Sequence, residues 1–69
     1  MIREGTKVKW NWGSGTAEGK VQKTYDHEVK RTIKGSEITR KGEPGNKALL
    51  ISQEDGSEVL KLESEVNRA

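Results

Sequence analysis

The sequence contains no cysteine and no phenylalanine, and it has one proline and one histidine. Without cysteine, neither a disulfide framework nor a thiolate metal site can stabilise the chain, and its composition fits a reducing cytoplasm. A single histidine with no cysteine also leaves no set of acid, base and nucleophile for catalysis. We therefore expect a cytoplasmic protein that is not an enzyme and that needs no metal or other cofactor.

Long apolar runs are also missing. Residues 1–7 lack the hydrophobic stretch of a secretory signal, and no segment is long enough to span a membrane, so we expect a soluble protein with no membrane contact. A chain of 69 residues buries only about 60% of the surface that its unfolded form exposes. We expect residues 1–69 to form a single small domain with a thin core.

Charge is abundant but unevenly spread along the chain. Residues 1–42 carry ten Lys or Arg and five Asp or Glu, a net charge of +5, whereas residues 43–69 carry three and six, a net charge of −3. This asymmetry allows a basic face opposite an acidic one. The alternative is that a chain with 35% charged residues is keeping a small surface soluble.

Both tryptophans lie on one predicted strand, over residues 7–12. Val8, Trp10 and Trp12 alternate with polar residues, so one strand face is apolar and the other polar. Gly-Ser-Gly at 13–15 then ends the strand in a turn. We expect Trp10 to lie in the core, whereas Trp12, beside the turn, is the better candidate for an exposed ring.

A second strand is predicted over residues 17–25, because Val21 and Tyr25 share a parity. Residues at the other parity would face solvent, namely Lys20, Gln22 and Thr24. A turn follows, with Asp26 as its most characteristic residue.

Two further β-prone runs, 29–34 and 37–41, are separated by Gly35-Ser36. Glycine at the first position of a two-residue connection indicates a type II′ hairpin. The predicted register pairs Lys34 with Glu37, Ile33 with Ile38, Thr32 with Thr39, and Arg31 with Arg40.

After a loop at 42–46, Ala48–Ile51 is an apolar run without alternation, which indicates a strand covered on both faces. Asp55-Gly56 gives a type I′ hairpin signal into a strand over 58–62. The predicted pairs are Ile51 with Leu60 and Leu49 with Leu62. A one-residue slip or a bulge stays open as the alternative, because Leu50 and Val59 lie on the other parity.

Five or six short strands joined by glycine-rich turns predict an all-β fold, a small antiparallel barrel of the SH3-like or Tudor kind. Residues 63–66 can add a single C-terminal helical turn, with Val66 covering one end of the core.

Motifs along the chain carry a family resemblance. They are Gly5-x-Lys7-Val8-x-Trp10-x-Trp12-Gly13-Ser14-Gly15, Gly19-x-Val21, Thr32-Ile33-x-Gly35-x-x-Ile38-x-Arg40, Asp55-Gly56-x-x-Val59-Leu60-Lys61 and Ser64-Glu65. In this order they resemble the hypervirulence-associated protein TUDOR domain family, over nearly the whole chain. The resemblance implies a Tudor or SH3-like barrel. Family members often have an aromatic residue in the strand after the proline loop, where this chain has Leu49 or Leu50, so no aromatic cage is expected to use that position.

The glycine-rich run 13–20 is not a phosphate-binding loop. A Walker loop needs glycine in place of Ser14 and Ser or Thr in place of Val21, and a dinucleotide fingerprint needs its third glycine in place of Glu18. Both loops also need a following helix, whereas residues 20–25 have the pattern of a strand. His27 is predicted to be solvated, as a lone histidine in a turn-like Asp-His-Glu usually is. With Asp26 and Glu28 it could hold a metal only if the chain brought other ligands, because adjacent strand residues point to opposite faces.

We expect a non-enzymatic binding module whose basic face engages a polyanion, with nucleic acid as the leading candidate. A second hypothesis is a Tudor-like protein-interaction module, in which Trp12 and Tyr25 hold a methylated lysine or a peptide. A third ligand class is a phosphorylated metabolite or nucleotide. The candidate anion-binding residues are Lys7, Lys9, Lys20, Lys23, Lys30, Arg31, Lys34, Arg40 and Lys41.

The predicted register of the 29–41 hairpin suggests a specific anion site. Arg31 directly across from Arg40 would be destabilising unless an anion lay between the two guanidinium groups. Lys23 shares the parity of the neighbouring core residues and is a third possible contact. The alternative is that acidic residues neutralise the pair, with Glu18, Glu28 and Glu43 as candidates.

Overall fold

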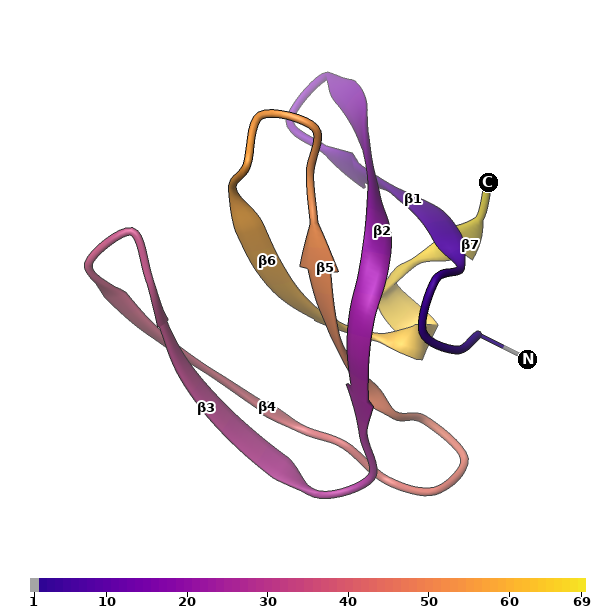
Figure 1. Cartoon of the computed structure of the whole chain (residues 1–69), viewed down its shortest axis with the longest axis vertical. Coiled ribbons are helices and arrows are strands. Elements are labelled where there is room, and N and C mark those ends of the chain that lie inside the picture. The colour runs from indigo at the N-terminus through magenta and orange to yellow at the C-terminus, as the bar shows by residue number, and fades with distance from the viewer. Residues whose placement is uncertain (1) are drawn as a thin grey trace.

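The computed structural model describes residues 2–69, which form two antiparallel sheets (Figure 1). The first sheet has the strand order β6-β5-β2-β1-β7, and the second is the β3–β4 hairpin. Only one 3₁₀ turn, η1, interrupts the β structure of the described chain, which confirms the predicted all-β, SH3-like class. The elements are β1 (Lys7–Trp12), β2 (Gly15–Tyr25), β3 (Glu28–Ile33), β4 (Ser36–Lys41), β5 (Ala48–Ser52), β6 (Glu58–Leu62), η1 (Glu63–Glu65) and β7 (Asn67–Arg68).

Strand β5 is buried on both faces, as its unbroken apolar sequence predicted. One face contributes Leu49 and Ile51 to a first core cluster, and the other contributes Ala48 to a second. The second cluster forms where the β3–β4 hairpin packs against β6. The first comprises Val8, Trp10, Val21, Leu49, Ile51 and Val66, and the second comprises Val29, Ala48 and Leu60, with Tyr25, Ile33, Ile38 and Leu62 packed against it.

A bulge in β2 changes which of its residues face the core. Val21 pairs with Ile51, but the next pair is Lys23 with Leu50, so Gln22 is the extra residue. Val21 therefore packs in the first cluster, whereas Tyr25 packs against the second. The prediction that Val21 and Tyr25 share a face is wrong, because the extra residue at the bulge shifts the alternation of side chains between the two sheet faces by one position.

The predicted register of the β3–β4 hairpin is wrong by two residues. Ile33 pairs with Ser36, so the turn residues are Lys34 and Gly35. Both have positive φ, 51° and 79°, which is the pattern of a type I′ turn and not of the expected type II′ turn. Arg31 consequently lies opposite Ile38, not opposite Arg40.

The β5–β6 hairpin adopts the alternative of a one-residue slip. Leu50 pairs with Leu60, and Ile51 pairs with Val59. The cause is the turn, in which the Gly56 N–H donates to the carbonyl of Gln53 at 3.0 Å. Gly56 itself has φ 87°. The two strands are therefore joined by a three-residue loop, 54–56, and not by the predicted two-residue Asp-Gly turn.

The C-terminal segment confirms the predicted helical turn, since η1 is followed by the buried residue Val66. Strand β7, which pairs Asn67 with Lys9 and Arg68 with Val8, was not predicted, because a two-residue strand carries no periodic signal. Within residues 2–69, no helix is long and apolar enough to cross a membrane.

Candidate functional site

Two lysines face each other directly across the first hairpin. The β1–β2 register pairs Lys7 with Lys20, followed by Lys9 with Glu18. These residues alternate with the buried Val8 and Trp10, so they lie on the solvent face of the hairpin, and all four are exposed. Like charges placed directly opposite are destabilising. The sequence predicted two like charges opposite each other at Arg31 and Arg40. In the structure, such a pair is formed by Lys7 and Lys20 instead.

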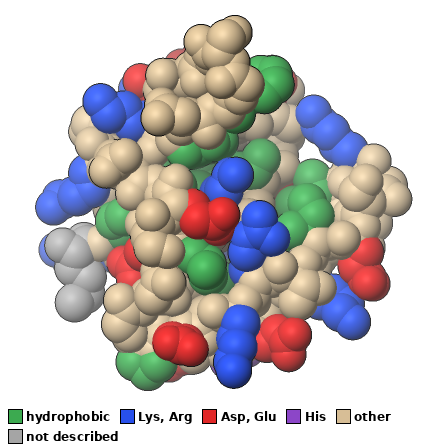
Figure 2. All heavy atoms as spheres, turned by 180° about the vertical axis from the view of Figure 1, so that it is seen from behind, with side chains coloured by type: hydrophobic (Ala, Val, Ile, Leu, Met, Phe, Trp, Pro, Cys, Tyr) green, Lys and Arg blue, Asp and Glu red, His purple; other side chains and the backbone are tan. Residues whose placement is uncertain are grey.

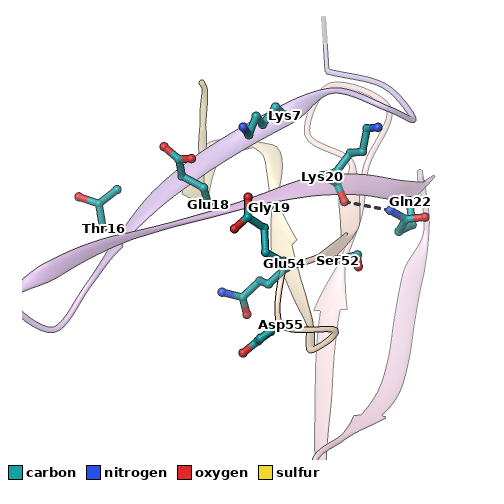
Figure 3. Close-up of a pocket in the computed structure, with 10 residues that line it drawn as sticks. Lys7, Thr16, Glu18, Gly19, Lys20, Gln22, Ser52, Glu54 and Asp55 are labelled. Atoms are coloured by element: carbon teal, nitrogen blue, oxygen red, sulfur yellow. Dashed lines mark hydrogen bonds between the residues drawn. The ribbon is translucent and has the colours of Figure 1, made fainter.

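An open groove of about 760 Å³ runs beside this lysine pair (Figure 3). The β1–β2 hairpin supplies Lys7, Lys20 and Glu18, and the loop between β5 and β6 supplies Glu54 and Asp55. Its other lining residues are Thr16, Gly19, Gln22, Ser52 and Gln53. The groove therefore combines two cations from one hairpin with carboxylates from the facing loop.

Asp55 is held in a fixed position by the loop that carries it. The Ser57 hydroxyl donates to the Asp55 carboxylate at 2.6 Å, and the Ser57 N–H donates to it at 2.9 Å. These two hydrogen bonds lower the pKa of Asp55 below its ordinary value, and Lys34 contributes in the same direction. Asp55 thus remains ionised at neutral pH, with Ser57 as its main partner.

Lys7, Lys9 and Lys20 have no ion pair among the described residues. The salt bridges within residues 2–69 join Asp26 to His27, Glu58 to Arg31 and Glu65 to Arg40, and none contains a lysine. Exposed ammonium groups without a carboxylate partner remain available to an anion from solution.

Arg31 and Arg40 do not form the anion site that the sequence suggested. Both lie on the inner face of the β3–β4 hairpin, where Arg31 approaches Glu58 at 3.8 Å and Arg40 donates through Nε to Glu65 at 3.1 Å. Each guanidinium is therefore neutralised by an acidic residue, as the alternative to an anion site predicted. The acids are Glu58 and Glu65, however, and not the predicted Glu18, Glu28 and Glu43, which lie nearer to the arginines in the sequence.

The other predicted basic residues lie on further surfaces. Lys30 and Lys41 are on the outer face of the β3–β4 hairpin, where Lys41 pairs across the strands with Glu28. Lys34 is at the tip of that hairpin, and Lys23 is exposed beyond the bulge of β2. Figure 2 shows one face of the molecule, on which basic and acidic side chains are interspersed. The predicted cations are thus divided among several surfaces, and in the described strand pairings Lys7 and Lys20 are the two that lie directly opposite each other.

Trp12 and Tyr25 do not come together in one aromatic cage. Trp12 pairs with Gly15 at the first residue of β2, and Tyr25 is the last residue of the same strand (Figure 1). Tyr25 is half-buried against the second core cluster, whereas Trp12 is 67% exposed. The predicted aromatic site is corrected accordingly: the two residues lie beside opposite ends of β2 and form no cage around a methylated lysine, whereas their contact with an extended peptide stays a prediction.

His27 lies beside Tyr25, with ring centroids 5.7 Å apart in an edge-to-face arrangement. Its Nδ1 is 3.3 Å from the Asp26 carboxylate, and both side chains are exposed. This is the solvated histidine that the sequence predicted.

The pairing of Lys7 with Lys20 was not predicted, although the sequence contains a signal for it. Counting outward from a two-residue turn at Gly13-Ser14 pairs Trp12 with Gly15 and, five steps further, Lys7 with Lys20. The loop residues Glu54 and Asp55 have no such signal, since their position in the groove depends on the long-range pairing of β2 with β5.

Comparison with known families supports the fold and the motifs together. The family model described as hypervirulence associated proteins TUDOR domain matches residues 5–66. No match was found among curated proteins or among solved structures. The matched range begins before β1 and ends after η1, so it includes all three hairpins and the groove. The chain therefore belongs to the hypervirulence-associated protein TUDOR domain family, a family of small binding modules.

Proposed function

We propose that this single domain is a non-catalytic module that binds nucleic acid, or another polyanion, through Lys7, Lys9 and Lys20. The observation that carries the proposal is the direct cross-strand pairing of Lys7 with Lys20 on an exposed face. The chain has no cysteine, which fits a site of action in the reducing cytoplasm.

An anion between the two ammonium groups would remove an unfavourable feature of the fold. Directly opposed residues in an antiparallel pair have Cβ atoms about 5 Å apart, so Lys7 and Lys20 repel each other when nothing lies between them. A phosphate oxygen within reach of both side chains replaces this repulsion with two charge-assisted hydrogen bonds.

The same face offers a second phosphate position. Lys9 lies two residues beyond Lys7, about 6.6 Å along the strand on the same side. Asn11 and Thr16 continue this face as an exposed polar pair. Successive contacts along a strand suit a ligand with repeated charges, and each neutralised phosphate releases counterions.

The test is a salt titration of binding to single- and double-stranded DNA and RNA, followed by fluorescence anisotropy. We expect the logarithm of the binding constant to fall linearly with the logarithm of salt concentration. Lys7→Gln combined with Lys20→Gln should reduce that slope by about 0.7–0.9, the contribution of the one phosphate that the two lysines share. The double substitution also removes the repulsion, so the protein itself should be at least as stable as before.

Lys30→Gln combined with Lys41→Gln is the matched control. It removes the same charge from exposed cross-hairpin positions on the other sheet, where both signs of charge are mixed. The proposal fails if no nucleic acid binds at low salt, if the salt dependence is flat, or if the control pair lowers the slope as much as Lys7 and Lys20 do.

The groove is large enough for a second candidate ligand, a phosphorylated metabolite or nucleotide, which would have to bind the lysines and avoid the carboxylates of Glu18, Glu54 and Asp55. Its volume of about 760 Å³ is within the range of small-molecule sites, and Lys7 and Lys20 could bind one phosphate group in it. Calorimetric titration with mononucleotides distinguishes the two candidates. A mononucleotide that binds as tightly as an oligonucleotide would assign the groove to a small ligand.

The absence of catalysis is part of the proposal and has its own test. Reproducible turnover by the purified protein that is lost in His27→Ala would contradict it, because His27 is the only imidazole in the chain.

A further inference from the structure

Trp12 is the one large hydrophobic side chain exposed among residues 2–69, at 67%. Trp10, two residues earlier on the same strand, is only 5% exposed and belongs to the first core cluster. The core therefore uses one indole and leaves the other in solvent. An aromatic ring of this size has a large apolar surface, and its exposure is not explained by packing.

The exposure follows from the position of Trp12 in the hairpin. It is the last residue of β1, and its cross-strand partner is Gly15, which has no side chain to cover the ring. The neighbouring Gly13, with φ 54°, begins the turn. Strand β7 pairs only with Val8 and Lys9, so in the described chain the edge of β1 is unpaired next to Trp12.

We infer that Trp12 is a stacking platform for an unpaired base, which makes single-stranded nucleic acid the ligand of this domain. The inference rests on the proposed polyanion binding at Lys7, Lys9 and Lys20. Aromatic rings beside a basic track bind single strands without a sequence preference, because every base has a π-face. In a duplex the bases are already stacked and paired, so the indole has no base face to contact.

The arrangement defines the path of the strand. Trp12 has the parity of Val8 and Trp10, so its ring leaves the sheet on the side opposite to Lys9. Trp12 lies five positions beyond Lys7, about 17 Å along β1. A chain whose phosphates contact the lysines must therefore run toward the tip of the hairpin and cross the unpaired edge of β1 to place a base on the Trp12 ring.

The experiment compares single-stranded and duplex oligonucleotides of the same sequence, on the order of ten nucleotides long, at one salt concentration. Trp12→Ala should weaken single-strand binding by about 5- to 150-fold and leave duplex binding unchanged. Trp12→Phe should restore part of the loss, because it keeps a ring. Thr39→Ala, at an exposed position on β4 of the other sheet, is the control and should have little effect on single-strand or duplex binding.

Fluorescence gives a second readout in the unsubstituted protein. A bound single strand should quench the exposed Trp12, and Trp12→Phe should abolish the quenching because the remaining Trp10 is buried. The inference is overturned if Trp12→Ala leaves single-strand affinity unchanged, or if it weakens duplex binding equally. Dependence on Lys7 and Lys20 without dependence on Trp12 would refute the stacking role alone, whereas no binding of either nucleic acid would refute the proposed function as well.

Discussion

Gly19 lies where no side chain can be accommodated. A Cβ atom at this position would meet the side chain of Ile51 and would lie 2.8 Å from the carbonyl oxygen of Ser52. We expect Gly19→Ala to lower the free energy of unfolding by about 1–3 kcal/mol, because the surrounding backbone must shift to accept the methyl group. Urea unfolding followed by tryptophan fluorescence measures this loss.

Gly15, on the same strand, is the matched control. A Cβ there meets nothing within 4 Å, and its φ is not positive. Gly15→Ala should therefore leave stability unchanged or raise it by about 0.4–1 kcal/mol, through a less flexible unfolded chain. Equal losses in the two variants would show that contact at Gly19 is not what excludes a side chain.

Individual environments were predictable from sequence where they depend on near neighbours. Trp10 in the core and Trp12 in solvent follow from strand parity and from the glycine turn beside Trp12. The acidic partners of Arg31 and Arg40 were not predictable in this way, because Glu58 and Glu65 lie on other elements, 27 and 25 residues away along the chain.

The tip of the β3–β4 hairpin holds a residue in an unfavourable conformation. Lys34 has φ 51°, the left-handed region, which costs roughly 1–2 kcal/mol for most residues and less for asparagine. Asn-Gly is also the preferred pair of a type I′ turn. Lys34→Asn should therefore raise the free energy of unfolding by about 0.5–1 kcal/mol, as measured by thermal or urea unfolding.

Lys30→Asn removes the same charge from an exposed position inside β3, where asparagine is a poor strand residue. It should lower stability slightly. If both substitutions are destabilising, the turn is not at Lys34-Gly35, and the register of this hairpin would need revision.

Apolar patterns predicted the elements well and their registers poorly. In β3–β4 the predicted and observed registers differ by two residues, so both leave Val29, Ile33 and Ile38 on the inner face and the pattern cannot choose between them. In the β5–β6 hairpin, β5 is buried on both faces, so the order of apolar residues does not indicate the register of this hairpin either. Turn geometry decided both cases, and a glycine fits more than one turn type.

At the scale of the whole molecule, the fold mixes the charges that the sequence separates. The acidic C-terminal part places Glu58 and Glu65 beside Arg31 and Arg40 of the basic N-terminal part. Acidic loop residues likewise line the groove together with Lys7. A net charge of +5 over residues 1–42 therefore does not produce a single basic face, and the candidate site is reduced to one hairpin.

Glu65 connects three parts of the molecule, and its ionisation should influence the stability of the whole. Burial alone would raise the pKa of Glu65, but the hydrogen bond from the Leu62 N–H, at 2.8 Å, and the Arg40 guanidinium together lower it below its ordinary value of 4.5. A carboxyl group with a lowered pKa in the folded state stabilises the fold at pH values above its unfolded pKa. This stabilisation is lost as the pH falls through the folded pKa.

Glu65→Gln should therefore lower the free energy of unfolding at neutral pH by about 1 kcal/mol, at the low end for a charged hydrogen bond because the carboxylate is one-third exposed. Its stability should also fall less steeply with acid, since the substituted group no longer titrates. Urea unfolding at neutral pH and again below pH 4.5 measures both effects. Glu43→Gln, on an exposed loop residue, should keep the pH dependence of the unsubstituted protein. If Glu65→Gln keeps it as well, the bonds from Leu62 and Arg40 do not couple protonation to folding, and η1 is held in place by the burial of Val66 instead.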